Sequence, residues 1–163
     1  NMSDAVALMN KEAKSLGETA SNFVNPHGLY NDNHYTTAYD LYLIFNEAIK
    51  YSKFVDTLSC MKYTGSFTRK TAYGDYSIGC SYTNSNGFLT GSYATPDGIK
   101  VYGGKAGYTE VARRSYVMLA ESNNGHKYII ITMRAESNSL MYKDLSALLN
   151  KIPVEKKSYA DNE

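Results

Sequence analysis

Tryptophan is absent from this chain of 163 residues, and cysteine, histidine and proline are scarce. The two cysteines, Cys60 and Cys80, form neither a zinc pair nor a disulfide framework, because zinc ligands occur in couples about two to four residues apart. A single bridge between them stays open, since spacing says nothing about the geometry that a disulfide needs. The sequence therefore predicts no metal and no cofactor.

Neither sign of charge dominates, and long apolar runs are missing. Lysine and arginine (17) nearly balance aspartate and glutamate (16), which excludes the basic footprint of a nucleic-acid-binding protein. No apolar stretch approaches the roughly 20 residues that span a bilayer. The first residues, "NMSDAVALMNKEAKSLG", carry charges on a helical period where a secretory signal would be apolar without interruption. We expect one domain, or a large part of one, that opens without a signal peptide.

Two segments in the first third of the chain have the periodicity of amphipathic helices. In residues 3–16 apolar side chains recur at intervals of three and four, and Ser3 is available as N-cap. A second apolar face follows a cap at Thr36 or Thr37 and ends near Lys50. The segment between them is rich in Asn and Gly and is predicted to be a structured loop.

The rest of the chain favours strands and one closing helix. Short β-prone pieces occur at 62–68 and 76–83, and Asn-Gly and Asp-Gly turn signals follow them. Three stronger strand segments are 99–107, 113–122 and 126–136, of which the last two flank an Asn-Asn-Gly hairpin turn. Finally, 137–149 has a helical period with its leucines on one side.

The order of these segments predicts an α+β fold, in which the closing helix lies on a sheet of three antiparallel strands. Such a sheet keeps an exposed edge, and edges of that length are usually paired by more strands. We therefore expect association with another copy or with a missing N-terminal part. Residues 153–163 are polar and are expected to fray.

One predicted strand places a lysine among glycines, in "VYGGKAGY". Gly103, Gly104 and Gly107 leave the face of the strand bare, so that the backbone of a ligand can lie against it. The ammonium of Lys105 offers a charge to a carboxylate, and the C-terminus of a peptide fits both features. Spacing alone also admits a β-bulge, or a lysine that protects an edge strand from aggregation.

Six segments resemble, in order, the penicillin-binding serine D-alanyl-D-alanine carboxypeptidases of the bacterial cell wall, in their secreted Gram-positive form. They are "VALMNKEAKSLG", "ETASNFVNPHGL", "HYTTAYDLYLIFNEAI", "GFLTG", "GGKAGYT" and "MRAESNSLMYKDLSALLNKI". The resemblance runs over nearly the whole chain. It implies that residues 1–152 are the C-terminal part of a catalytic domain with the β-lactamase/penicillin-binding (transpeptidase-like) fold.

The resemblance also implies serine chemistry on peptidoglycan stem peptides. In that family the serine of an S-x-x-K motif attacks the D-Ala-D-Ala carbonyl, its lysine assists proton transfer, an S-x-N motif helps, and a K-T-G strand binds the substrate carboxylate. Lys105 and Gly107 match the first and third positions of K-T-G, whereas Ala106 departs from the second. Alanine lacks the hydroxyl expected to bind the carboxylate, and such a lost hydrogen bond costs roughly 1.5 to 3 kcal/mol.

The resemblance places the other two motifs before or around the first residue, and neither occurs at the start of this sequence. Ser59 and Lys62, in "SCMK", have the S-x-x-K spacing but occur where the family has an ordinary segment. As a nucleophile, Ser59 would have to begin a helix with Lys62 one turn on. Ser122 and Asn124 have the S-x-N spacing, but a hairpin turn explains them. We expect no catalytic residue within this chain.

Other polar residues have simpler explanations. His27, in an Asn-Pro-rich loop, is typical of a structural hydrogen-bonding residue. Asp40 and Glu47 share one helix face and are expected to be solvated charges. Arg113 and Arg114 follow the lysine strand, and they either add positive charge to a carboxylate pocket or pair with an acidic neighbour.

The resemblance predicts an extracellular or envelope-associated chain that supplies the carboxylate-binding strand of a D,D-carboxypeptidase, through Lys105, Ala106 and Gly107. Its expected partners are a stem peptide or a β-lactam, together with the missing N-terminal part of the domain or another copy. The alternative is a non-catalytic module of the same fold that binds peptidoglycan peptides or regulates a partner. Ala106 is consistent with that alternative, because the substitution removes a substrate-binding hydroxyl.

Overall fold

The computed structural model describes residues 1–17 and 20–155, which combine helices with antiparallel strands. The elements are α1 (Met2–Ser15), α2 (Ala38–Ala48), α3 (Ser52–Ser59), β1 (Lys62–Arg69), β2 (Tyr76–Thr83), β3 (Ile99–Thr109), β4 (Arg113–Ser122), β5 (Lys127–Ala135) and α4 (Asn138–Leu149). This composition confirms the predicted α+β class.

The predicted helices are confirmed, with one different cap and one additional helix. Asn1, not the expected Ser3, caps α1: its side chain accepts a hydrogen bond from the Asp4 amide at 3.0 Å, which completes a capping box. Thr37 caps α2 as predicted. The sequence pattern does not predict α3, because this helix starts soon after α2 ends and Tyr51 provides no side-chain cap.

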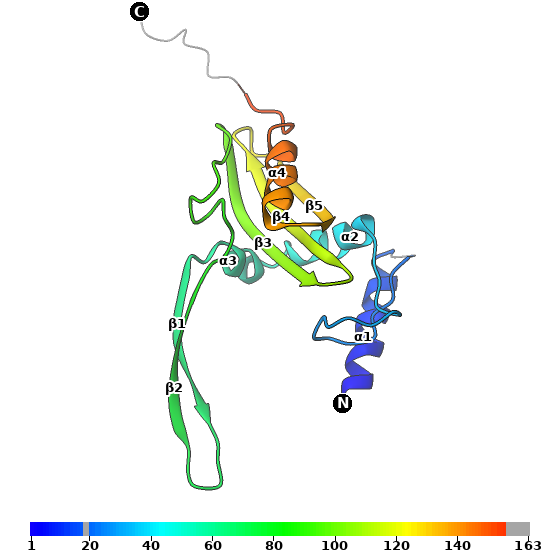
Figure 1. Cartoon of the computed structure of the whole chain (residues 1–163), viewed down its shortest axis with the longest axis vertical. Coiled ribbons are helices and arrows are strands. Elements are labelled where there is room, and N and C mark those ends of the chain that lie inside the picture. The colour runs from blue at the N-terminus through cyan, green and yellow to red at the C-terminus, as the bar shows by residue number, and fades with distance from the viewer. Residues whose placement is uncertain (18–19, 156–163) are drawn as a thin grey trace, which may run out of the picture.

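β3, β4 and β5 form one antiparallel sheet with β4 in the centre, as predicted (Figure 1). β3 continues past the predicted end at Gly107 to Thr109. Its register shifts between Val101 and Gly103, so the β-bulge that the glycines suggested is present. Within the described residues, the outer edges of β3 and β5 pair with no further strand.

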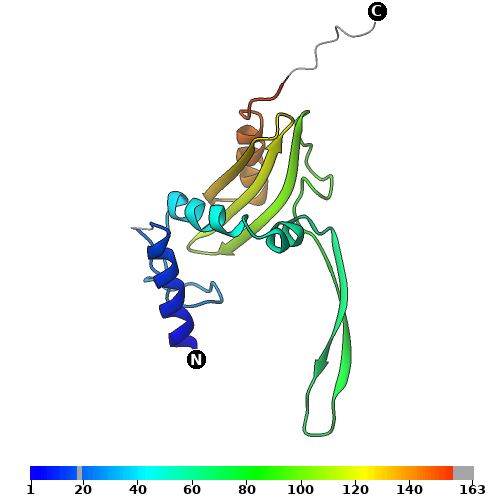
Figure 2. The same cartoon turned by 180° about the vertical axis from the view of Figure 1, so that it is seen from behind.

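Helices cover both faces of this sheet (Figures 1 and 2). α4 packs on one face, where Met118 and Ala120 of β4 point toward it, while Leu119 points to α2 and α3 on the other face. All three of these β4 residues are fully buried. Leu145 and Leu149 of α4 are equally inaccessible, so the closing helix lies on the sheet as expected.

β1 and β2 form a separate antiparallel hairpin that projects from the rest of the molecule (Figure 1). Its register pairs Tyr63 with Tyr82 and Phe67 with Ile78, which lie on one face because side chains alternate along a strand. The opposite face carries mainly hydroxyl groups, from Thr64, Thr68, Ser66, Ser77, Ser81 and Thr83. The hairpin is therefore amphipathic, although most of its side chains are exposed.

Hydrogen bonds connect the loop between α1 and α2 to both of these helices. The Asn10 side chain donates to the Phe23 carbonyl at 2.7 Å and accepts from the Phe23 amide at 2.9 Å. Asp40 accepts from the Ala20 amide and from the Ser21 hydroxyl, and only 1% of its surface is exposed. The prediction that Asp40 is a solvated charge is therefore wrong, because its buried carboxylate accepts hydrogen bonds from this loop.

The beginning of the predicted polar tail is hydrogen-bonded to the turn that follows β4. Asn123 donates to the carbonyl of Glu155 at 2.8 Å and accepts from its amide at 2.9 Å. The prediction of fraying at 153–163 therefore does not hold at Glu155, and residues 156–163 lie outside the described part of the chain.

Candidate functional site

The glycines around Lys105 serve different purposes. Gly103 has a positive φ of +120°, and a Cβ there would lie 2.2 Å from the Leu58 carbonyl oxygen. At Gly104 a Cβ would lie 2.1 Å from the Val117 carbonyl oxygen. Both glycines are thus required by packing against α3 and β4, and the expectation that they leave the strand bare for a ligand is wrong. A Cβ at Gly107 would meet nothing within 4 Å, so this glycine does border open space.

Lys105 lies on the side of β3 that faces α2 and α3. It lines a cleft of about 430 Å³, together with Leu41, Ile44, Phe45, Phe54, Thr57, Leu58, Asn84, Gly104 and Val117. The walls are mostly apolar, and the Lys105 ammonium donates a hydrogen bond to the carbonyl oxygen of Ala106. An exposed cation beside an apolar cleft suits a ligand that has a polar or anionic end.

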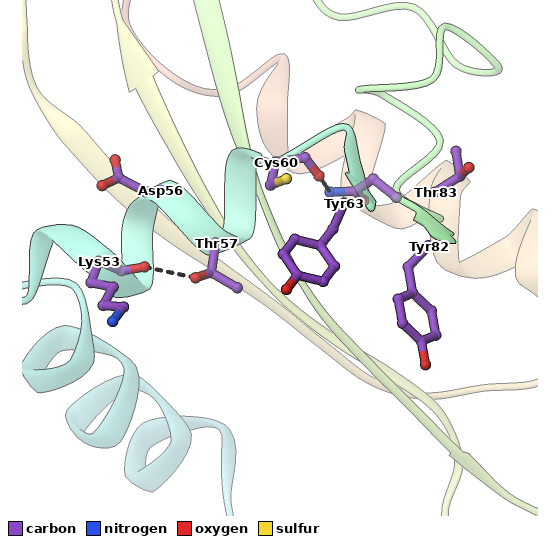
Figure 3. A pocket seen from close by; sticks show the side chains of 8 residues that line it. Lys53, Asp56, Thr57, Cys60, Tyr63, Tyr82 and Thr83 are labelled. Carbon is purple, nitrogen blue, oxygen red and sulfur yellow. Dashed lines mark hydrogen bonds between the residues drawn. The ribbon is translucent and has the colours of Figure 1, made fainter. Parts of the chain in front are cut away.

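A second cavity, of about 510 Å³, adjoins this cleft and shares Thr57 and Asn84 with it (Figure 3). Tyr63 and Tyr82, from the base of the hairpin, provide aromatic walls. Cys60 is the nucleophilic side chain in its lining, and its thiol donates to the Lys62 carbonyl. Lys53 and Asp56 of α3 also line this cavity, which extends the cleft toward the base of the hairpin.

The "SCMK" segment lacks the geometry of an S-x-x-K nucleophile. Ser59 is the last residue of α3, and its hydroxyl donates to the Val55 carbonyl at 3.1 Å. Lys62 is the first residue of β1, so the two side chains are not one helical turn apart. Ser122 ends β4, and its hydroxyl donates to Asn124 within the turn that was predicted there.

The two arginines after the lysine strand have different partners. Arg113 has a left-handed backbone, and its Nε lies 3.6 Å from a carboxylate oxygen of Glu136. Arg114 stands over the ring of Tyr108, with 4.6 Å between the guanidinium carbon and the ring centroid. Each predicted alternative therefore applies to one arginine. Arg113 pairs with an acidic neighbour, whereas Arg114 lies beside the Lys105–Gly107 segment.

Two further candidates have structural roles. His27 accepts a hydrogen bond from the Leu29 amide at 3.2 Å, which confirms the predicted structural role. Glu47 pairs with Lys50 at 2.5 Å on the surface of α2.

A buried polar network, which no sequence pattern predicts, holds the segment before β3. Asn86 is only 1% exposed, donates to the Tyr116 hydroxyl at 2.9 Å and accepts from the Phe88 amide at 2.9 Å. Tyr142 accepts from the Gly87 amide at 2.7 Å. Burial raises the pKa of Tyr116 to about 12. The only sequence signal at this place, Asn-Gly, indicates a turn but not its packing partners.

The described residues contain neither a cluster of metal-ligating side chains nor a disulfide. Residues 1–17 and 20–155 contain no cluster of three or more His, Cys, Asp or Glu side chains arranged to hold a metal ion. Cys60 and Cys80 are both free thiols. None of the helices in the described ranges is long and apolar enough to cross a membrane.

Known proteins resemble this chain in sequence and in fold. A family model described as D-alanyl-D-alanine carboxypeptidase (peptidase S11) matches residues 1–137. The D-alanyl-D-alanine carboxypeptidase DacF of Bacillus subtilis is 34% identical over 124 residues, which is 74% of this chain and 27% of DacF.

Solved structures with the same architecture come from several bacteria. The D-alanyl-D-alanine carboxypeptidase of Mycobacterium tuberculosis superposes with a TM-score of 0.68 and 25% identity, over 92% of this chain and 53% of that one. The DD-transpeptidase of Streptomyces K15 gives a TM-score of 0.74 and 26% identity, over 89% of this chain and 52% of that one. The chain thus spans about half the length of these two structures, and its fold is that of the penicillin-binding proteins and DD-peptidases. It belongs to the D-alanyl-D-alanine carboxypeptidase family.

Proposed function

We propose that this chain binds the D-Ala-D-Ala end of peptidoglycan stem peptides along the outer edge of β3. The observation that carries the proposal is the exposed segment Lys105–Gly107 on an edge strand, in a member of this family. An extended peptide adds to such an edge as a further strand, through main-chain hydrogen bonds. The open space beside Gly107 leaves room for that backbone.

Lys105 is the residue that the proposal assigns to the polar end of the substrate. Its side chain is exposed beside the 430 Å³ cleft, where an ammonium supplies a point charge to carbonyl or carboxylate oxygens. Ala106 contributes backbone contacts only, because its methyl group cannot donate a hydrogen bond.

In a complete serine-type carboxypeptidase, such a strand serves the trimming of stem peptides, with the nucleophile supplied from outside this chain. Peptidoglycan lies outside the cell membrane, so this role implies an extracellular or envelope location. A non-catalytic peptide-binding or regulatory module is the second candidate, and Ala106 favours it. β-Lactams belong to the ligands that either form would bind.

Peptide binding tests the proposal directly. Titration with an N-acylated peptide ending in D-Ala-D-Ala should shift the amide resonances of β3, and the L-Ala-L-Ala peptide should not. Lys105→Gln should weaken binding about tenfold, as expected for the loss of one charged hydrogen bond. Lys100→Gln is the matched control, since Lys100 lies on the same strand but over the Tyr102 ring, at 4.3 Å. Equal binding of both peptides, or no effect of Lys105→Gln, contradicts the proposal.

Intact mass after incubation with a β-lactam separates catalysis from binding. We expect no covalent adduct on this chain alone, because Ser59 ends a helix and donates its hydroxyl to the backbone. An adduct that maps to Ser59 would show that the chain carries its own nucleophile. The Ser59→Ala variant provides the control for any mass increase.

A further inference from the structure

Arg114 has a hydrogen-bonding group that nothing in the described residues satisfies. Its Nε is buried and has no hydrogen-bond partner in that part of the chain. The residue lies on β4, directly opposite Tyr108 of β3, and the guanidinium stacks on that ring at 4.6 Å. Stacking holds the flat cation in one orientation. A buried N–H without a partner costs free energy, so this guanidinium is held in one orientation without the acceptor that a buried arginine usually has.

Glu136, which pairs with the neighbouring arginine, does not supply that acceptor. Glu136 lies 3.6 Å from the Nε of Arg113, the neighbour of Arg114. Arg113 reaches Glu136 from a left-handed backbone conformation, with a φ of 59°. Two adjacent arginines are therefore distinguished by their surroundings: one has an acidic partner and the other has none within the described ranges.

Arg114 borders a small cavity next to the Lys105–Gly107 segment. The cavity has a volume of about 110 Å³ and is lined by Ala106, Gly107, Tyr108, Arg114, Asn138 and Met141. No carboxylate is among these residues, and Asn138 is the first residue of α4, a helix end with positive partial charge. A cavity of this size admits a carboxylate group, since one water occupies about 30 Å³.

We propose that Arg114 binds the terminal carboxylate of the substrate peptide, on the α4 side of β3. The inference deepens the proposed function and rests on it. The planar guanidinium presents paired N–H donors that match the two oxygens of a carboxylate. The backbone of Gly107 borders the same cavity, next to Ala106 and Tyr108.

This assignment changes the roles of the residues beside it. Along β3 the side chains alternate, so Lys105, opposite Val117, faces α2 and α3, whereas Ala106, opposite Tyr116, faces α4. Arg114 is on the same face as Ala106 and supplies a charged donor where alanine supplies none. Lys105 then remains available for carbonyl oxygens of the substrate in the other cleft.

The test compares a D-Ala-D-Ala peptide that has a free C-terminal carboxylate with the same peptide as its C-terminal amide. The unaltered chain should bind the acid at least about tenfold more tightly than the amide, as a charged hydrogen bond predicts. Arg114→Gln should bind both peptides equally, while Arg113→Gln should keep the preference. If Arg114→Gln keeps the preference, or Arg113→Gln loses it, the assignment is wrong. Amide spectra of both variants establish that each is folded.

Failure of the proposed function would be recognised separately. If neither peptide binds the unaltered chain, the proposal that β3 binds peptides is wrong. The carboxylate site is then tested by titration with acetate alone. A shift of the Arg114 side-chain Nε–Hε resonance that exceeds the shift of the Arg113 resonance supports the carboxylate site without the peptide. Equal or absent shifts overturn it.

Discussion

At the residue scale, two glycines of β3 have different roles: one is required by packing, and the other borders the space proposed for the ligand. The backbone of Gly104 passes so close to β4 that a Cβ would lie 2.9 Å from the Met118 Cα, whereas Gly107 borders open space. The buried side chain of Asn86 likewise has contacts that fix its identity, because it accepts from the Phe88 and Leu89 amides before β3 and donates to the Tyr116 hydroxyl of β4. Side chains at these positions are dictated by contacts, not by strand propensity.

Gly104→Ala should therefore destabilise the chain, and Gly107→Ala should not. Overpacking of this kind costs about 1 to 3 kcal/mol, while an exposed substitution usually changes stability by less than about 0.5 kcal/mol. Urea unfolding of the two variants checks the difference. Equal midpoints would mean that β3 and β4 approach less closely than described. Gly107→Ala should instead weaken peptide binding, because its Cβ enters the space left for the ligand.

At the element scale, the loop between α1 and α2 depends on a neutral histidine. His34 accepts a hydrogen bond from the Val24 amide at 3.2 Å, and its ring lies edge-on to Phe23. Burial lowers the pKa of His34 below 6.5, and the nearby His27 lowers it further. Protonation converts the accepting nitrogen into a donor, so it removes the bond to Val24.

Acidification should accordingly loosen this loop. Between the lowered pKa of folded His34 and 6.5, the unfolded state binds a proton that the folded state does not, so stability falls as the pH drops through that window. Hydrogen exchange at the Val24 amide, followed with decreasing pH, measures the effect. His34→Gln keeps an acceptor that does not titrate and should remove the pH dependence. Persistence of the dependence in that variant would assign it to another group.

At the scale of the whole molecule, stability resides in the sheet and its helices, and the hairpin is peripheral. Leu145 is fully buried between α4 and the sheet. β1 and β2 pack mainly on each other, and the hairpin projects away from the sheet (Figure 2). Helices of the penicillin-binding fold thus cover both faces of the sheet, while the hairpin extends from the base of the adjoining cavity.

Leu145→Ala should lower the free energy of unfolding by about 2 to 5 kcal/mol, the usual cost of a buried leucine. Shortening the hairpin, by joining Ser66 to Gly79 through an Asn-Gly turn, should leave the midpoint of thermal unfolding nearly unchanged. Calorimetry compares the two. A comparable loss of stability on shortening would show that the hairpin belongs to the cooperative core.

Local patterns determined most of the secondary structure of this protein. Apolar periodicity and turn signals are properties of a few neighbouring residues, so the helices at both ends, the three strands and the K-x-G segment follow from the sequence by itself. α3 does not, because its short amphipathic run has no capping residue and follows α2 too closely. The family, too, is carried by the order of local segments.

Only the tertiary structure decided what these elements bring together. Gly103 and Gly104 are needed because α3 and β4 approach them, and Asp40 is buried because a distant loop requires its carboxylate. The sequence places Arg113 and Arg114 side by side, yet the sheet register gives one an acidic partner and the other a small cavity beside β3. Partners far apart along the chain depend on packing, which no local pattern encodes.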